Sequence, residues 1–88
     1  MTWDLHLNGC ASLKDKRRIL KSVKDRLHHQ LNVSVAETGR HDLWQRGELT
    51  AAAAATDRRQ AEEVLGAAER LIASHPLVRI IDSSMTFA

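Results

Sequence analysis

The sequence predicts an α+β domain in which two helices pack on one face of a four-stranded antiparallel sheet. Apolar side chains recur at helical spacing in residues 12–31 and 57–74, whereas four shorter stretches alternate every two residues or are rich in Val and Ile. The order strand, helix, strand, strand, helix, strand is the split β-α-β-β-α-β arrangement, also called ferredoxin-like. Right-handed crossovers place both helices on one face and give the strand order 4-1-3-2.

The first strand is predicted over residues 2–8. Trp3, Leu5 and Leu7 alternate with polar residues, which is typical of a strand with one buried face. Gly9 ends it, and Cys10 and Ala11 form a turn. The polar positions of this strand, with those of the next two, predict an open sheet face made of Thr2, Asp4, His6, Asn8, Ser34, Ala36, Thr50, Ala52 and Ala54.

The first helix is predicted over residues 12–31, with Ser12 as its N-cap and Asp15 in its first turn. At about 100° per residue, one narrow sector collects five leucine and valine side chains and is expected to be buried. That sector consists of Leu13, Leu20, Val23, Leu27 and Leu31, and its less charged flank holds Ile19, Ser22 and Arg26.

The other flank of this helix is basic. It carries Lys14, Arg17, Lys21, Lys24 and His28, with Arg18 just beyond. Residues 12–31 hold seven Lys and Arg and two Asp, a net charge of +5; the whole chain is +2, so the remainder sums to −3. Two interpretations stand: a solvated face whose cationic stems cover the core edge, or an anion-binding surface.

The second half of the chain is predicted as strand, strand, helix and strand. Val33 and Val35 face the core in the second strand, and a wide connection follows it. Residues 47–56 are read as a strand, although the alanine run also allows one long helix over residues 48–73. Asp57 and Gln60 resemble a capping box and favour a helix start at residue 57. The stretch 77–88 is predicted as the last strand.

Length and composition set further limits. At 88 residues the chain is expected to be a single domain, residues 1–88, burying roughly 60 to 65% of its unfolded surface, so dimerisation would help it. The sequence has neither an apolar run long enough to span a membrane nor a secretory leader pattern, and its single Cys10 fits a reducing compartment. We therefore expect a cytoplasmic protein that does not associate with a membrane.

Several functional classes are disfavoured. An RNA-recognition motif needs stacking aromatics on the open face of its sheet, but the alternation in the first strand places Trp3 on the buried face. The single cysteine and the adjacent His28 and His29, which point about 100° apart, argue against a metal site or cofactor. Asp4 and His6 share one side of the first strand, so an enzyme or small-molecule sensor using them with Glu37 stays as a less favoured alternative.

The strings SLKDKRR, LNVSVAE and DLWQR together resemble the YlxP-like family of small bacterial proteins of unknown function, over nearly the whole chain. The resemblance implies a ferredoxin-like fold and carries over no catalytic residues. The resemblance also implies a gene placed beside genes for translation initiation and ribosome maturation. The alanine run at 51–55 and the string TGRH depart from the family pattern. The matched positions include Ser12, Leu13, Lys14, Lys16, Arg17, Asn32, Ser34, Glu37, Asp42, Trp44, Gln45 and Arg46.

These observations predict a non-enzymatic binding module whose partner is RNA or a ribosomal particle. The candidate anion-binding residues are Lys14, Arg17, Arg18, Lys21, Lys24, Trp44 and Arg46. Trp44 lies in a polar connection, either as a lid on the core or a second subunit, or as an aromatic that stacks on a base or partner. A homodimeric interaction domain using the open sheet or an edge strand is the alternative.

Overall fold

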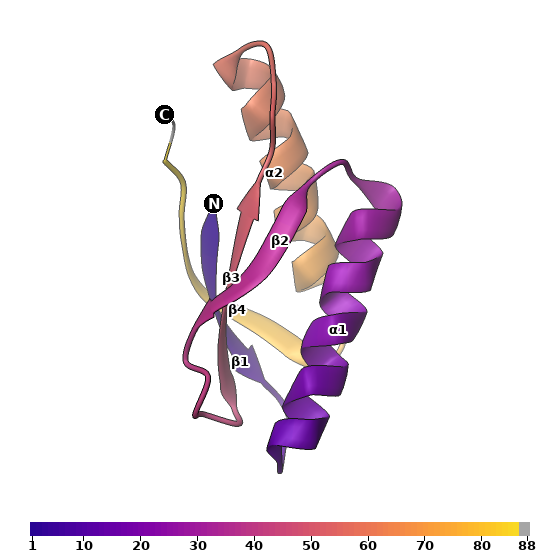
Figure 1. Cartoon of the computed structure of the whole chain (residues 1–88), viewed down its shortest axis with the longest axis vertical. Coiled ribbons are helices and arrows are strands. Elements are labelled where there is room, and N and C mark those ends of the chain that lie inside the picture. The colour runs from indigo at the N-terminus through magenta and orange to yellow at the C-terminus, as the bar shows by residue number, and fades with distance from the viewer. Residues whose placement is uncertain (87–88) are drawn as a thin grey trace.

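The computed structural model describes residues 1–86 and contains the six predicted elements in the predicted order (Figure 1). They are β1 (Thr2–Leu7), α1 (Leu13–Gln30), β2 (Ser34–Gly39), β3 (Arg46–Ala52), α2 (Arg58–Ala73) and β4 (Val78–Ser84). Only Ala51 and Ala52 of the alanine run belong to β3, so this strand is shorter than the predicted 47–56, and residues 53–57 connect it to the helix that begins after Asp57. The last strand is shorter than predicted, and residues 87 and 88 of that prediction lie outside the described part.

The four strands form one antiparallel sheet in the order β2-β3-β1-β4. This confirms the predicted order and places β1 in the centre, between β3 and β4. Both edge strands are irregular: the pairing of β2 with β3 shifts register between Glu37 and Gly39, and that of β1 with β4 shifts between Asp4 and Leu5. The fold is a ferredoxin-like α+β sandwich.

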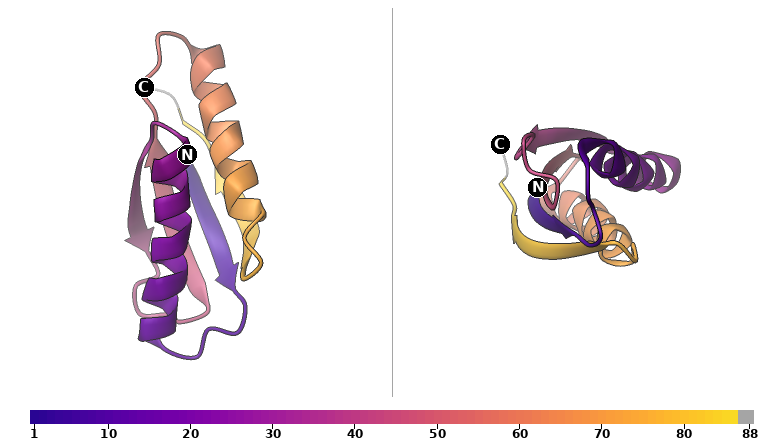
Figure 2. Two further views of the ribbon diagram at one scale, coloured as in Figure 1. Left: turned by 90° about the vertical axis from the view of Figure 1, so that its right-hand side faces the viewer. Right: turned by 90° about the horizontal axis from the view of Figure 1, so that it is seen from below.

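Both helices lie on the same face of the sheet, next to each other (Figure 2). Their starts are capped as predicted: the Ser12 hydroxyl accepts from the Asp15 N–H at 3.1 Å, and the Asp57 carboxylate accepts from the Gln60 N–H at 2.8 Å. Gln60 departs from a strict capping box, because its side-chain oxygen accepts from the Thr56 N–H rather than from Asp57.

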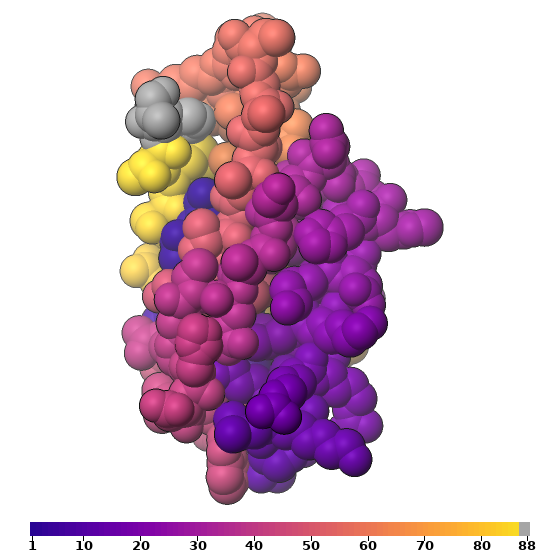
Figure 3. Space-filling view, viewed as in Figure 1, coloured from indigo at the N-terminus to yellow at the C-terminus, as the bar shows by residue number. Residues whose placement is uncertain are grey.

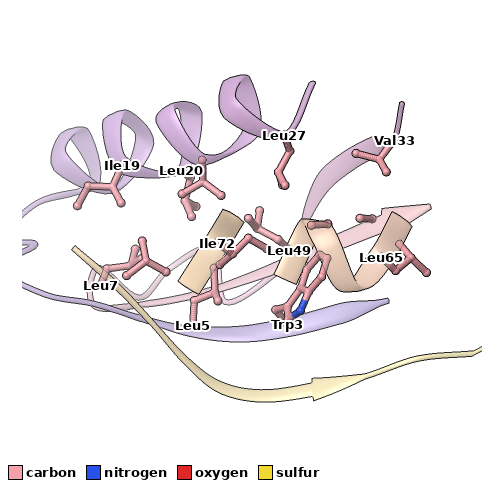
Figure 4. Close-up of a cluster of buried hydrophobic side chains, with 14 of the residues drawn as sticks. Trp3, Leu5, Leu7, Ile19, Leu20, Leu27, Val33, Leu49, Leu65 and Ile72 are labelled. Atoms are coloured by element: carbon pink, nitrogen blue, oxygen red, sulfur yellow. The ribbon is translucent and has the colours of Figure 1, made fainter. Parts of the chain in front are cut away.

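The core lies between the helices and the inner face of the sheet (Figure 4). Trp3, Leu5 and Leu7 of β1 are fully buried, as their alternation predicts. The Trp3 indole N–H donates to Glu69 Oε1 on α2 at 3.1 Å, so the one polar atom of this core tryptophan is satisfied. Ala51 of β3 is also buried, and its small side chain lets α2 lie close to the sheet.

The buried face of α1 is rotated relative to the predicted sector. Ile19, placed on a flank by the sequence, is buried, whereas Leu13 is 38% exposed and Leu31 only half-buried. Leu13 begins the first turn of α1 and Leu31 is its C-cap, so both lie at the ends of the helix, beyond its buried residues, which run from Lys16 to Leu27.

The opposite face of the sheet is open and polar, as predicted. Hydroxyl groups of three strands meet on it: Thr50 Oγ1 lies 3.0 Å from Thr2 Oγ1 and 2.8 Å from Thr38 Oγ1, and Thr38 also donates to Glu48 at 2.7 Å. This face has no exposed aromatic side chain within residues 1–86.

Candidate nucleic-acid interface

A groove runs between α1 and the edge strand β2, on the side shown in Figure 3, where α1 is violet and β2 magenta. Its volume is about 470 Å³. Leu20 and Val35 are its apolar residues, and cationic side chains of α1 form one wall. We call it the basic groove; it is lined by Arg17, Leu20, Lys21, Lys24, Asp25, His28, Val35 and Glu37.

The predicted cations of α1 differ in how free they are. The Arg18 guanidinium lies 2.7 Å from Asp15, and the Lys21 ammonium lies 2.8 Å from Asp25. The Lys21 hydrogen bond lowers the pKa of Asp25 and raises that of Lys21. By contrast, Lys14, Arg17 and Lys24 have no carboxylate within ion-pair distance in the part of the chain that the structure describes. These three carry the uncompensated charge of the basic flank of α1, whereas Arg26, which donates to the Ser74 hydroxyl at 3.2 Å, lies on the other flank.

Trp44 and Arg46 lie outside the basic groove. They line a separate hollow of about 340 Å³ formed by residues 42–46 of the hairpin between β2 and β3. Trp44 is half-exposed, but Arg46 donates to Asp4 Oδ2 at 2.6 Å. The structure thus separates the seven candidate residues. Arg17, Lys21 and Lys24 line the groove, Lys14 lies in the first turn of α1, and Trp44 and Arg46 lie at the hairpin. Arg18 lines a different hollow, which it shares with Ile19 and His75.

Asp4 is the anchor of this hairpin. It accepts from Arg40 at 2.9 and 3.2 Å as well as from Arg46, across 36 and 42 residues of sequence. Burial acts to raise the pKa of Asp4, but the hydrogen bonds from Arg46 and Arg40 outweigh burial and hold that pKa below its ordinary value. Asp4 is therefore an ionised carboxylate that binds two guanidinium groups.

The residues of the enzyme alternative do not converge. His6 Nδ1 pairs with Asn8 Oδ1 at 2.9 Å, whereas Asp4 binds the two arginines. Glu37 lies beside α1, where its carboxylate is 3.2 Å from the Lys16 ammonium. This arrangement holds no carboxylate-oriented histidine.

Lys16 is the residue whose environment the sequence prediction missed. It is 2% exposed, it pairs with Glu37 and it donates to the backbone carbonyl of Arg40. A signal existed in the spacing: Lys16 precedes Leu20, Val23 and Leu27 by 4, 7 and 11 residues and so belongs to the buried side of the helix. Its ammonium extends past the core edge to reach β2.

His75 is the second buried polar side chain. Its Nδ1 accepts from the Leu77 N–H at 3.2 Å, so Nε2 carries the proton and donates to the Ser22 hydroxyl at 3.3 Å. Burial, and secondarily the charge of Arg26, lower the pKa of His75. It is a neutral structural histidine that joins α1 to the turn before β4.

Within residues 1–86, no group of three or more His, Cys, Asp or Glu side chains is placed to hold a metal ion. Cys10 is buried and carries no disulfide. Neither helix of the described chain has the length and apolar character needed to cross a bilayer.

Comparison with known sequences places the chain in a family. Residues 1–85 match the family described as "Protein of unknown function (DUF503)". The chain belongs to the DUF503 family. This DUF503 chain is also 40% identical, over 66 residues, to the uncharacterized protein YlxP of Bacillus subtilis (strain 168). The matched region covers 75% of this chain and 72% of YlxP. The comparison confirms the YlxP-like resemblance.

Proposed function

We propose that the protein is a non-enzymatic RNA-binding module that associates with ribosomal particles through the basic groove and the first turn of α1. The observation that carries this proposal is the group of cations on one flank of α1 that have no carboxylate within ion-pair distance in the described part of the chain: Lys14, Arg17 and Lys24. Arg26, Arg70 and Arg79 also lack such a partner within residues 1–86, but they lie away from this flank. Elsewhere the chain neutralises many of its cations, as in the pairs Arg40–Asp4, Arg46–Asp4 and Arg59–Glu63.

The spacing along α1 suits a repeating anion. Arg17, Lys21 and Lys24 follow one another at four and three residues, so their side chains neighbour each other along one flank. The Lys21–Asp25 pair is exposed and contributes little to stability, so a phosphate replaces the carboxylate at small cost. Contacts of this kind go to phosphates and depend weakly on base sequence.

The choice of ribosomal RNA rests on the family resemblance, which implies genes placed beside those for translation initiation and ribosome maturation. A cytoplasmic location is part of this proposal, and the free thiol of Cys10 supports it because thiols stay reduced there.

The test is RNA binding at two salt concentrations. The variant Lys14→Glu, Arg17→Glu, Lys24→Glu should bind more weakly, and its logarithmic salt slope should fall by about 2, since about 0.7 counterions are released per single-strand phosphate. The matched control Arg59→Glu, Arg70→Glu, Arg79→Glu makes the same charge change on α2 and β4. Equal weak binding by wild type and both variants would sink the proposal.

A second measurement addresses the particle. The wild type should co-sediment with ribosomal particles and leave them at high salt, whereas the groove variant should stay in the supernatant. Retention of the groove variant on the particles at low salt would contradict the assigned surface.

A homodimer is the second candidate function. It is favoured by Ile81, which is 44% exposed on the edge strand β4. An exposed apolar side chain on an edge strand is a site at which a second copy of the chain can pack. Sedimentation should then show a dimer that Ile81→Asp dissociates. Only monomer at high micromolar concentration would count against it.

A further inference from the structure

The loop of residues 40–45, which joins β2 to β3, is fixed at both ends. At its start, the buried Lys16 ammonium binds the Arg40 carbonyl, and the Arg40 guanidinium binds both oxygens of Asp4. At its end, the Gln45 carbonyl accepts from the Leu7 N–H at 2.8 Å, and the next residue, Arg46, binds Asp4. Both ends are therefore attached to the central strand, and the start is attached to α1 as well.

The path of the chain through the loop is also constrained. Arg40 has φ +58°, a left-handed conformation that a residue with a Cβ adopts at a cost and only when its surroundings impose it. Its carbonyl accepts from the Leu43 N–H at 3.2 Å, which closes a turn. The interactions of Lys16 and Asp4 with Arg40 supply the constraint.

This constrained loop presents apolar side chains to solvent. Leu43 is 47% and Trp44 50% exposed, and within residues 1–86 the Trp44 indole N–H has no hydrogen-bond partner. A ligand that binds a half-exposed indole on a fixed loop loses little free energy to ordering the loop, because the loop is already ordered. Trp44 is thus a preorganised contact and not part of the core, where Trp3 is fully buried.

The loop adjoins the basic groove. Arg17 and Glu37 line the groove, Glu37 pairs with Lys16, and Lys16 holds the first residue of the loop. Figure 3 shows α1, β2 and the hairpin on one side of the molecule. An RNA strand that follows the groove toward the start of α1 therefore arrives at this loop.

We infer that the loop of residues 40–45 is a stacking platform on which Trp44 holds an unpaired base of the RNA whose phosphates follow the basic groove. This inference rests on the proposed function and names its ligand class: single-stranded RNA or an unpaired loop or end. In a duplex both faces of a base are already stacked, so Trp44 has nothing to bind there. Asp4 lines neither the basic groove nor the hollow beside Trp44 and is a positioning residue.

The first experiment compares a single-stranded oligoribonucleotide of mixed sequence, about ten nucleotides long, with its duplex. Trp44→Leu should weaken single-strand binding about tenfold or more, as expected for the loss of one stacked base. Trp44→Phe should retain most of the affinity, and Trp44→Leu should keep the wild-type salt slope. The duplex should bind wild type and Trp44→Leu alike.

The outcomes separate the two proposals. Salt-sensitive binding of single strands that Trp44→Leu leaves unchanged overturns the stacking platform and leaves the groove in place; such a result would assign Trp44 to a protein partner. Absence of any salt-sensitive RNA binding by the wild type overturns the proposed function, and the platform with it.

The second experiment tests Asp4. Stacking should quench part of the tryptophan fluorescence in the wild type, and this quenching should be absent in Trp44→Phe. Asp4→Asn should reduce the quenching without changing the salt slope, whereas Asp82→Asn, the matched control on the same sheet face, should change neither. Full quenching in folded Asp4→Asn, checked by urea unfolding, overturns the positioning role.

Discussion

A lysine buried at a helix–strand contact has to reach an acceptor, and Lys16 reaches two. Its stem lies on the core side of α1, while its ammonium contacts the Glu37 carboxylate and the Arg40 carbonyl. One side chain therefore ties the first turns of α1 to both the edge strand and the loop that follows it. Removing it leaves Glu37 without its cation and the Arg40 carbonyl without its side-chain donor, while Asp4 still binds the Arg40 guanidinium.

Lys16→Met keeps the stem and removes the charge. We expect it to lower the free energy of unfolding by about 2 kcal/mol, less than for a fully buried pair because Glu37 is 28% exposed. Urea unfolding measures the change. Lys21→Met, which breaks an exposed pair on the same helix, serves as the control and should leave stability unchanged within error. Equal effects of the two substitutions would contradict this account.

His75 links stability to pH. Its pKa in the folded protein lies below the ordinary value of 6.5, so at pH values below 6.5 the unfolded chain takes up a proton that the folded chain does not. The contribution of neutral His75 to the free energy of unfolding is therefore complete above pH 6.5 and is lost as the pH falls below it. Urea midpoints measured at decreasing pH should decline in the wild type and decline less in His75→Asn. The same slope in both proteins would show that His75 is not the group responsible.

At the scale of elements, β3 shows why local propensity did not decide between strand and helix. Its alanines favour a helix intrinsically, but β3 pairs with β1 on one side and β2 on the other, and these long-range bonds decide its conformation. Neighbouring alanines then have opposite roles. Ala51 is 1% exposed beneath the helices, whereas Ala52 is on the open face.

Ala51→Leu and Ala52→Leu form a matched pair. The first forces extra carbon atoms between β3 and the helices and should cost about 1 to 3 kcal/mol of unfolding free energy. The second adds the same atoms on the solvent side and should be tolerated. Thermal or urea unfolding of both variants checks the difference, and a stable Ala51→Leu would mean that space remains above β3.

Much of this fold could be predicted from sequence because its signals are local. Ser12 and Asp57 lie at helix starts, and the alternation of Trp3, Leu5 and Leu7 fixes the inner face of β1. The candidate site was predicted less completely. Arg46 is a candidate anion-binding residue by sequence, and the pattern gives no sign of its partner Asp4, which lies 42 residues away on another strand. Such cross-strand pairs leave no periodic trace in the sequence.

At the scale of the whole molecule, one hydrophobic cluster joins every helix and strand, because each element contributes a residue either to the cluster or to the partly buried side chains packed against it. We therefore expect two-state unfolding. In Trp44→Phe, Trp3 is the single remaining indole and reports on the core, while far-UV circular dichroism reports mainly on the helices. The two signals should give the same urea midpoint. Separate midpoints would reveal a part of the chain that unfolds independently.

The central position of β1 has a consequence for synthesis. This strand is synthesised before both of its neighbours, because β3 begins more than 40 residues and β4 more than 70 residues further along the chain. At about 5 to 20 residues per second, the nascent chain carries Trp3, Leu5 and Leu7 without β4 for roughly 4 to 15 seconds. The sheet can be completed only after β4 has emerged.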